Sequence, residues 1–431
     1  MKGFLIAAPS SGSGKTTIAR GLMALFVGKG LKVQPFKCGP DYIDTKFHTA
    51  VCSRPSVNLD TFMATSSHVR HLLCRYGKDT DMCIVEGMMG LYDGYDRYHG
   101  SSAEIAQVLR IPVVLVVDAR SAAYSLAPLL SGFLNFRQDV NICGVIFNKV
   151  GSGRHVQMLR QVCDELGVTC FGCIPKDASI ELGSRYLGLD FSEEADNHRL
   201  VELLEAHLDV DALMGLSFEL DGQDELLPDS SSAHDPGKVL VARNAESFSF
   251  LYQETVDGFT DVSFFDPESD VPLLDDVSLL YLPGGYPEKH LDALVANETA
   301  RQAIHQYAER GGRVVAECGG MMFLCDKIVT DDGEYPMCGV LPYVISARKA
   351  DRRLSLGYRR FMLDGQEFKG HEFHYTQFLG ETPMSAAQVY NALGNPVDTP
   401  VFRYQNVLAS YTHLYAGFAL KRNMQASLQK E

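Results

Sequence analysis

The chain has 431 residues, 46% of them hydrophobic and 22% charged, with a mean hydropathy of −0.06. These values are typical of a globular protein, and the length exceeds what a single core usually organises, so two or three domains are expected. The formal net charge of −15 argues against nucleic acid and membranes as partners, and an anionic substrate would need a local basic patch. No apolar run reaches the ~18 residues of a membrane span, and residues 4–8 are too short for a signal-peptide core, so we expect a cytoplasmic protein.

Short apolar runs rich in Val and Ile recur through the first half of the chain, at residues 4–8, 82–85, 113–117 and 143–147. They show little polar alternation, which is typical of parallel strands covered by helices on both faces. Residues 32–36 also look like a strand, and a helix from about Gly14 to about Gly30 would make the first crossover. Residues 1–216 are therefore predicted to form an α/β domain built on a parallel sheet.

A glycine-rich loop joins the first predicted strand to that helix. Residues 9–17 read PSSGSGKTT, a variant phosphate loop in which Ala8 replaces the first glycine of the usual pattern. The glycines let backbone N–H groups approach phosphate at the start of the helix, Lys15 can reach the β- and γ-phosphates, and the Thr16 hydroxyl suits Mg²⁺. The alternative is an ordinary Gly/Ser turn followed by Lys and Thr. We predict an ATP-binding site formed by Gly12, Ser13, Gly14, Lys15, Thr16 and Thr17.

Acidic residues follow two of the predicted strands, in the segments KCGPDYID (37–44) and EGMMGLYD (86–93). Loops at the carboxyl ends of parallel strands form the ligand crevice of such sheets, and phosphoryl transfer with Mg²⁺ needs carboxylates there. We therefore assign functional roles to Asp41, Asp44, Glu86 and Asp93, with Glu86 at the position of a Walker B acid. Solvated or helix-capping acids are the alternative. Asn148 follows the fourth run and is either a residue that reads the adenine edge or an ordinary turn residue.

The alternating pattern stops at residues 217–237, which are acidic, aperiodic and rich in Ser, Asp, Pro and Gly. Such a segment is typical of an exposed linker. A second series of strands and helices starts at residue 238, with strand-like runs at 239–242, 279–282 and 314–316. Residues 238–431 are therefore predicted to form a second α/β domain of ordinary size.

Three motifs of the second half fit thiol chemistry. The segment RVVAECGGMMFL (313–324) predicts a nucleophile elbow that presents Cys318 at a helix N-terminus, where the helix lowers the thiol pKa. LPGGYPE (282–288) supplies Gly284 and Gly285, whose N–H groups can face a developing oxyanion, and SYTHLY (410–415) supplies His413 as general base. A buried cysteine in a Gly-rich turn and a structural histidine are the alternatives for each motif taken alone.

The order of these motifs is typical of a glutaminase, with one departure. Many enzymes of this type carry an acid two residues after the histidine, where this chain has Tyr415. The base would then lack a carboxylate partner. This predicts a glutaminase that is weak in isolation or tightly coupled to the other half.

The chain resembles the cobyrinate a,c-diamide synthases, within the cobyrinate/cobyric acid synthase group, nearly from end to end. The resemblance is carried by PSSGSGKTT, FKCGPDYID, VEGMMGLYDG, LPGGYPE, AECGGMMFL, LGYR, GHEFHY and SYTH. It implies a P-loop NTPase-like N-terminal domain, similar to dethiobiotin synthetase, and a class I glutamine amidotransferase-like C-terminal domain. ATP would phosphorylate the c and then the a acetate carboxylate of a corrin-type macrocycle. Ammonia released from L-glutamine at Cys318 would displace phosphate and give each amide, as a step of cobalamin biosynthesis.

The resemblance also implies roles for individual residues. Mg²⁺ would be bound by Thr16, Asp41 and Glu86. The carboxylate-activating site would be lined by Asp41, Tyr42, Asp44 and Asp93. The residue that faces the macrocycle from the C-terminal domain would be His374. The implied partners are the macrocycle, ATP and glutamine, and a homodimer is the protein assembly to consider.

Residues 346–360, SARKADRRLSLGYRR, form a basic segment in this acidic chain. Against the single acid Asp351, the basic residues are Arg348, Lys349, Arg352, Arg353, Arg359 and Arg360. A tetrapyrrole with many carboxylates needs such a patch, because Arg pairs with carboxylate through two parallel hydrogen bonds. We assign Arg352 and Arg353 to substrate binding; a solvated basic loop is the alternative.

Two other functions remain open from the sequence. The first is amidation of nickel-sirohydrochlorin by a closely similar enzyme of another tetrapyrrole pathway, which the motifs hardly separate. The second is a P-loop regulatory ATPase that makes no amide. The cysteine and histidine motifs of the second half argue against it, as do Ser10 and Ser11, where such ATPases have a second lysine.

Overall fold

The computed structural model describes residues 1–178, 197–220, 237–380 and 384–415. By its internal contacts the chain divides into two compact units, Met1–Leu227 and Pro228–Glu431, which we call the N-terminal and C-terminal units. The linker predicted at 217–237 lies, apart from its two ends, outside the described residues. Within the described ranges, no helix is both long enough and apolar enough to cross a membrane.

The N-terminal unit is organised by a seven-stranded sheet in which every pair of neighbouring strands is parallel. In spatial order its strands are β3 (Val57–Leu59), β2 (Val33–Cys38), β4 (Met82–Glu86), β1 (Gly3–Ala7), β5 (Val113–Asp118), β6 (Ile142–Val150) and β7 (Thr169–Pro175). All five apolar runs predicted as strands in this half are strands of this sheet. The predicted fold class is thereby confirmed for this unit.

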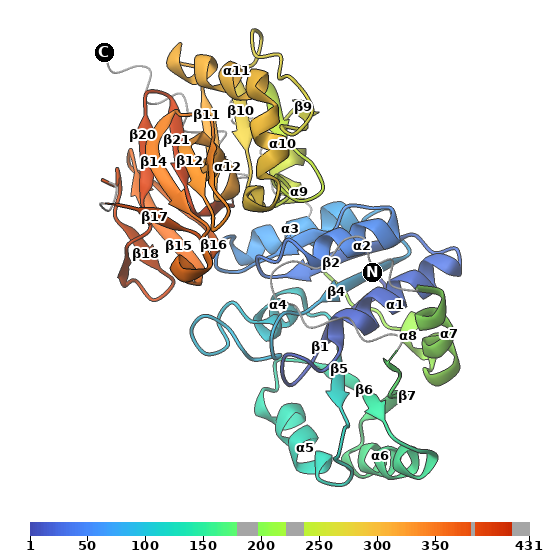
Figure 1. Cartoon of the computed structure of the whole chain (residues 1–431). Coiled ribbons are helices and arrows are strands. Elements are labelled where there is room, and N and C mark those ends of the chain that lie inside the picture. Colours follow the sequence, from blue (N-terminus) through green and yellow to red (C-terminus); the bar gives the residue numbers. More distant parts are fainter. Residues whose placement is uncertain (179–196, 221–236, 381–383, 416–431) are drawn as a thin grey trace. The chain divides into compact units, whose positions relative to one another are not determined.

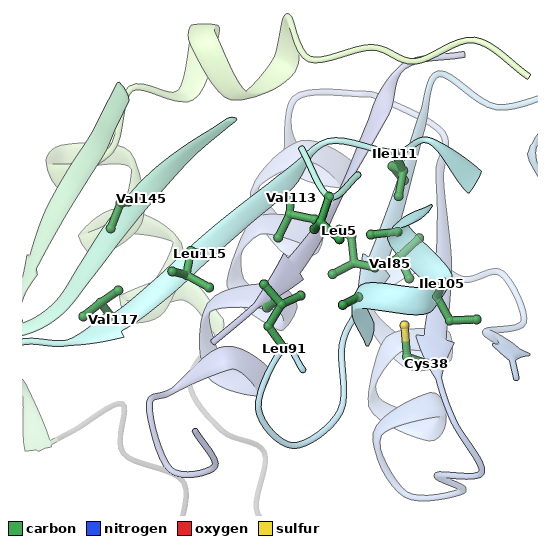
Figure 2. Packing of buried hydrophobic residues seen from close by; sticks show 14 of the residues in the cluster. Leu5, Cys38, Val85, Leu91, Ile105, Ile111, Val113, Leu115, Val117 and Val145 are labelled. Atoms are coloured by element: carbon green, nitrogen blue, oxygen red, sulfur yellow. The ribbon is translucent and has the colours of Figure 1, made fainter. Parts of the chain in front are cut away.

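Helices cover both faces of this sheet (Figure 1). They are α1 (Lys15–Gly28), α2 (Asp44–Cys52), α3 (Ser66–Gly77), α4 (Ser102–Leu109), α5 (Leu126–Phe136), α6 (Gly153–Leu166), α7 (Asn197–His207) and α8 (Val210–Met214). Successive residues of a strand point to opposite faces. Leu5 therefore packs in the core under α3–α6 (Figure 2), while Phe4 and Ile6 pack in the core under α1, α7 and α8. Burial on both faces explains why the strand sequences show no polar alternation.

The register of the central strands sets the position of the predicted phosphate site. Glu86, the last residue of β4, lies opposite Ile6 of β1 on one side and Lys37 of β2 on the other. Since all three strands run in the same direction, the loops that follow them leave the sheet at one edge. The phosphate loop and both acidic segments start at this edge.

The C-terminal unit contains a six-stranded sheet and two smaller ones. The six strands, in spatial order, are β20 (Val401–Tyr404), β21 (Val407–Ser410), β11 (Val314–Glu317), β10 (Leu279–Leu282), β8 (Lys238–Ala242) and β9 (Asp261–Phe265). All neighbours are parallel except β20, which pairs antiparallel with β21. The helices are α9 (Gln253–Asp257), α10 (Leu291–Ala296), α11 (Glu298–Glu309), α12 (Gly319–Leu324) and the 3₁₀ turns η4 (Pro287–Lys289) and η5 (Lys349–Asp351). The three predicted strands of this half are β8, β10 and β11.

The two smaller sheets were not anticipated from the sequence. One contains β13 (Glu334–Pro336), β12 (Cys325–Val329), β14 (Leu341–Ser346) and β17 (Gln377–Leu379). The other contains β19 (Pro396–Val397), β18 (Val389–Asn391), β15 (Ser355–Leu363), β16 (Gln366–His374) and β22 (His413–Leu414). Its central hairpin pairs β15 with β16 from Ser355 opposite His374 to Leu363 opposite Gln366. The basic segment and the GHEFHY motif therefore lie on strands of one hairpin and on the segment leading into it.

Candidate active sites

The phosphate loop connects β1 to α1, and its conformation depends on glycine. Gly14, at the N-cap of α1, has a φ of 96°, which side-chain-bearing residues rarely adopt. A Cβ at this position would lie 2.2 Å from Nδ2 of Asn148. Glycine is therefore required here both by the backbone angle and by the close approach of a side chain from β6.

Asn148 holds the phosphate loop in place. Its Nδ2 donates to the carbonyl of Ser13 at 3.0 Å, and its Oδ1 accepts from the N–H of Lys149 at 2.9 Å. Lys149 makes a second connection between β6 and the loop, because its Nζ donates to the carbonyl of Gly12 at 3.0 Å. The same Nζ donates to Oδ2 of Asp118, also at 3.0 Å. The observed contact of Asn148 is thus with the loop itself, and adenine recognition by this residue stays a prediction. Sequence reasoning missed Lys149.

The segment 86–93 lies over the loop. Leu91 N–H donates to the carbonyl of Ala8 at 2.8 Å, and the Lys15 ammonium donates to the carbonyl of Met89 at 2.7 Å. Asp93 braces this segment by accepting from the N–H of Gly90 at 3.0 Å. Lys15 thus extends from the first turn of α1, which also carries Thr16 and Thr17, toward the acidic segment that follows β4.

A buried ionic cluster lies beside the loop. The Thr16 hydroxyl donates to Oε1 of Glu86 at 2.6 Å, and the ammonium of Lys37 lies 3.1 Å from the same oxygen. Lys37 also contacts Oδ2 of Asp44 at 2.7 Å and Oδ2 of Asp41 at 3.9 Å. The four residues that we predicted to bind metal or activate the carboxylate here are therefore brought together, with Lys37 between the three acids.

The charges of this cluster stabilise one another. Burial alone would lower the pKa of Lys37, but the charges of Asp44, Glu86 and Asp41 outweigh it and raise that pKa above its ordinary value. Burial and the charge of Asp44 act to raise the pKa of Glu86, yet Lys37 and His48 outweigh them and lower it. Lys37 is therefore a cation and Glu86 an anion at neutral pH. Neither Lys37 nor His48 was given a role from the sequence.

The oxygen pair of Thr16 and Glu86 fits a nucleotide-bound Mg²⁺. In the described ranges, no group of three or more His, Cys, Asp or Glu residues could hold a metal ion by itself. Mg²⁺ in nucleotide sites needs only one or two protein oxygens, because phosphate oxygens and water complete its octahedron. A hydroxyl and a carboxylate oxygen 2.6 Å apart, at the start of α1, supply this donor set.

Asp41 and Tyr42 form the turn that leads into α2. One oxygen of Asp41, Oδ1, accepts from the N–H groups of Ile43 and Asp44, each at 2.9 Å. Asn58 donates to the carbonyl of Asp41 at 2.9 Å, and Tyr42 is buried. Asp41 is thus partly occupied with the turn, and its second oxygen is the one that faces Lys37.

In the C-terminal unit, Cys318 sits at a strained turn between β11 and α12. Its φ of 46° and ψ of −109° lie outside the ordinary regions for a residue with a side chain. Its N–H donates to the carbonyl of Ser410 at 2.8 Å. The two following glycines allow the sharp reversal: a Cβ would lie 2.8 Å from the carbonyl oxygen of Gly285 at Gly319, and 2.0 Å from that of Leu282 at Gly320. This is the geometry of a nucleophile elbow.

Gly284 marks the meeting point of the predicted thiol and base. A Cβ on Gly284 would lie 2.1 Å from Cε1 of His413, 2.7 Å from its Nδ1 and 3.2 Å from Cβ of Cys318. The two side chains therefore converge over the same glycine. In the sequence, Cys318 is 95 residues from His413 and 34 residues from Gly284. Gly285 is equally confined, because a Cβ there would lie 2.3 Å from the carbonyl oxygen of Ser247.

The expected low pKa of the Cys318 thiol is wrong. Burial, followed by the negative charge of Glu288, raises this pKa above its ordinary value, and the hydrogen bond from Gly319 N–H does not compensate. The helix behind the thiol has only six residues, so its dipole is small. Burial also lowers the pKa of His413 to about 3, with His371 and His374 acting in the same direction. The resting pair is therefore a neutral thiol beside a neutral imidazole.

His374 lies within a buried network of the C-terminal unit. Its ring nitrogens contact Oε1 of Glu372 at 2.7 Å and the carbonyl of Thr376 at 2.9 Å, and its ring stacks on Tyr411 at 3.6 Å between centroids. The preceding residue, Phe373, accepts the Cys318 thiol at 3.8 Å through its carbonyl. These contacts associate His374 with the thiol site, and its predicted contact with the macrocycle stays untested.

The basic segment is only partly a surface patch. Arg359 is buried and donates through Nε to Oε2 of Glu372, so its inclusion among the substrate-facing cations was wrong. Arg352 and Arg353, the two residues assigned to substrate binding, are exposed. The other exposed cations of the segment are Arg348, Lys349 and Arg360.

The residue that replaces the expected acid, Tyr415, has a carboxylate partner of its own. Its hydroxyl donates to Oε2 of Glu254, and its ring packs against Tyr252 with centroids 5.2 Å apart. The carboxylate whose charge acts on the pKa of His413 is Glu372. The predicted weakness of the isolated glutaminase stays a prediction.

A phosphate loop with a buried acid cluster in one unit, and a nucleophile elbow with an adjacent histidine in the other, define a two-domain, nucleotide-binding glutamine amidotransferase. Comparison with known families agrees: residues 4–188 match the CobQ/CobB/MinD/ParA nucleotide binding domain, and residues 250–419 match the CobB/CobQ-like glutamine amidotransferase domain. Similar proteins extend over almost the whole chain. The chain belongs to the cobyrinate and hydrogenobyrinate a,c-diamide synthase family, which confirms the resemblance seen in its motifs.

Three relatives illustrate this similarity. A cobyrinate a,c-diamide synthase of Caldanaerobacter subterraneus subsp. tengcongensis is 37% identical over 95% of this chain and 94% of its own length. Hydrogenobyrinate a,c-diamide synthases of Brucella abortus and Rhizobium meliloti are 38% and 37% identical, over 96% of this chain and 98% and 99% of theirs. Among solved structures, chloroplast FtsY from Physcomitrella patens matches with a TM-score of 0.30 and 17% identity, over 41% of this chain and 59% of that chain.

Proposed function

We propose that the chain catalyses ATP-dependent, glutamine-hydrolysing amidation of the a and c carboxylates of a corrin-type macrocycle. The observation that carries the proposal is the convergence of Cys318 and His413 over Gly284 in a chain that also holds a phosphate loop. A thiol, a base and a glycine turn supply nitrogen from glutamine, while a nucleotide site beside carboxylates supplies activation. Relatives that match 95% and 96% of the chain are named cobyrinate and hydrogenobyrinate a,c-diamide synthase.

In the N-terminal unit, the proposed chemistry is transfer of the γ-phosphoryl group of ATP to a carboxylate oxygen of the macrocycle. The products are an acyl phosphate and ADP. Lys15 and the loop N–H groups hold the phosphates, and Thr16 with Glu86 holds Mg²⁺, which when bound neutralises charge on the phosphates. Lys37 sits within the acid cluster and balances part of its charge, since three carboxylates surround one ammonium.

In the C-terminal unit, the proposed chemistry is hydrolysis of glutamine. Cys318 attacks the carboxamide carbon, His413 takes the thiol proton and passes it to the departing ammonia, and water then releases glutamate from the thioester. The N–H groups at Gly284 and Gly285 face the oxyanion of the intermediate. Because the resting thiol and imidazole are both neutral, thiolate formation is expected only when glutamine is bound. Ammonia finally displaces phosphate from the acyl phosphate and gives the amide.

The exposed part of the basic segment is the proposed contact for the macrocycle. Arg352 and Arg353 are followed directly by Leu354, which is 47% exposed, and soon after by Leu356, which is 55% exposed. Cations next to exposed apolar side chains suit a ring with a flat apolar surface and a periphery of carboxylates.

Mass spectrometry of the products tests the proposal. The protein is incubated with ATP, Mg²⁺, glutamine and one macrocycle. Three macrocycles are compared in separate reactions: cobyrinate and hydrogenobyrinate, which appear in the names of the relatives, and nickel-sirohydrochlorin. Two successive acid-to-amide conversions of a corrin macrocycle are expected. Conversion of nickel-sirohydrochlorin alone would transfer the assignment to the other pathway, and ATP hydrolysis without any amide would favour a regulatory ATPase.

A single substitution separates the two halves of the reaction. Cys318→Ser is expected to abolish amidation with glutamine and to preserve amidation with added ammonium chloride, because the phosphate site lies in the other unit. Continued use of glutamine by this variant would refute the assignment of the nucleophile.

A further inference from the structure

His48 of α2 is a buried histidine whose role the proposed reaction does not yet include. Its side chain is fully buried, and so is that of Glu86, the carboxylate that it contacts. His48 Nε2 lies 2.7 Å from Oε2 of Glu86, and His48 Nδ1 lies 3.3 Å from the hydroxyl of Ser56. Both ring nitrogens are therefore engaged, and the ring cannot rotate without losing two contacts.

The two carboxylate oxygens of Glu86 have different partners. Oε1 faces the phosphate loop, where it accepts from the Thr16 hydroxyl at 2.6 Å and lies 3.1 Å from Lys37 Nζ. Oε2 points the other way and meets His48. One oxygen is thus presented to the nucleotide site while the other is held by an imidazole.

The hydrogen bonds that link Glu86, His48 and Ser56 fix the imidazole of His48. Nε2 of His48 lies 2.7 Å from Oε2 of Glu86, and a carboxylate oxygen accepts hydrogen bonds, so Nε2 is the donor. Nδ1 lies 3.3 Å from the hydroxyl of Ser56, which can either donate or accept. Ser56 is itself fixed, because its N–H donates at 3.0 Å to the Thr49 hydroxyl, which donates at 2.7 Å to the carbonyl of Thr45 on α2. The imidazole is therefore held in one orientation, with a partner at each ring nitrogen.

We propose that His48 is a positioning residue that restricts Glu86 to coordination through one oxygen and thereby selects Mg²⁺ over Ca²⁺ at the nucleotide. The proposal rests on the metal site of the proposed function. Mg²⁺ demands a nearly ideal octahedron with ligands at about 2.0–2.1 Å, which one carboxylate oxygen satisfies, whereas Ca²⁺ accepts 6–8 ligands at about 2.3–2.6 Å and readily takes both oxygens of a carboxylate. Holding Oε2 away from the site removes the second mode. Partners that orient a ligating carboxylate commonly change metal affinity by about 10–100-fold when lost.

The test measures metal binding directly. Mn²⁺ bound to the protein with β,γ-imido-ATP is followed by electron paramagnetic resonance and displaced with Mg²⁺ or with Ca²⁺, which gives the ratio of their affinities. His48→Leu removes the donor and is expected to shift this ratio toward Ca²⁺ by about tenfold. His48→Gln keeps a donor that can reach Oε2 and is expected to restore the wild-type ratio. An unchanged ratio in a folded His48→Leu protein would leave His48 as a structural residue and overturn the proposal.

Three further variants keep the result interpretable. Ser56→Ala removes the partner of Nδ1 and is expected to shift the ratio in the same direction by less, which supplies the test should His48→Leu not fold; no shift there would overturn the proposal. His155→Leu is the matched control, because His155 lies on α6 and its ring contacts the carbonyl of Ala122. Glu86→Gln must weaken binding of both ions. If it does not, Glu86 is no ligand and the inference fails, while amide formation measured by mass spectrometry still judges the proposed function separately.

Discussion

Substitution of Gly284 by alanine offers a sharp test of the thiol site, because it adds one methyl group where the site has no room. Gly284 does not belong to the glycines with positive φ, so alanine can adopt its backbone conformation. The added Cβ would lie 2.1 Å from Cε1 of His413, whereas ordinary contact begins at 3.4 Å. The imidazole must therefore move by more than about 1 Å from its place beside Cys318, since close-packed interiors do not compress.

The size of the effect follows from this displacement. A misplacement of about 1 Å in a catalytic group costs about 10²-fold in rate, which corresponds to about 2.7 kcal/mol of transition-state stabilisation. Glutamine-dependent amidation by Gly284→Ala should fall by this factor. The rate with ammonium chloride should stay unchanged, because that route bypasses the base.

The assay compares glutamate release and amide formation with the two nitrogen sources under saturating ATP and macrocycle. Gly333→Ala is the matched control in the same unit, because its Cβ would find its nearest neighbour, Cε2 of Tyr335, at 3.8 Å. Thermal unfolding of both variants shows whether the fold is kept. Wild-type use of glutamine by a folded Gly284→Ala protein would refute the assignment of His413 as the base.

Three other outcomes are expected. Lys15→Ala should abolish amidation with glutamine and with ammonia alike, because both need the activated carboxylate; substantial ammonia-dependent activity would contradict its phosphate-binding role. Arg352→Glu together with Arg353→Glu should raise the KM for the macrocycle and leave the KM for ATP near the wild-type value, with Arg154→Glu together with Arg160→Glu on α6 as the charge-matched control. Glu372 is buried, which raises its pKa, but its hydrogen bonds and cationic neighbours outweigh burial and lower the pKa from 4.5 to about 2. Its stabilisation is therefore present above pH ~4.5 and lost as the pH falls toward 2, by about 3 kcal/mol in total; urea unfolding across this range should show a shallower decline for Glu372→Gln.

The sequence by itself determined the parallel sheet of the N-terminal unit and the motifs at its edge. Strands buried on both faces must be apolar at every position, so the runs at 4–8 and 113–117 identified β1 and β5 to within one residue at each end. The loops after β1, β2 and β4 carry the phosphate-binding and acidic segments, and the order of strand, glycine and acid is a local property of the chain. The motifs around Cys318 and Gly284 were found for the same reason.

The antiparallel part of the C-terminal unit was decided by tertiary structure. The long strand β16 (Gln366–His374) mixes buried and exposed residues irregularly, since both of its neighbours and the adjacent sheet determine which side chains are covered. Arg359 illustrates the consequence. Its position in a basic segment suggested a surface cation, whereas the pairing of β15 with β16 brings it next to Glu372 and buries it.

The contacts that position the side chains of the two sites could not be predicted from the sequence either. His48 meets Glu86 across 38 residues, and Asn148 meets Ser13 across 135. The pKa of Cys318 is set by how deeply packing buries the thiol rather than by the helix that follows it. Periodicity and glycine placement reveal which backbone a segment adopts, because they act between residues close in sequence. Burial, charge state and the approach of distant side chains depend on how whole elements pack, and only the folded chain contains that information.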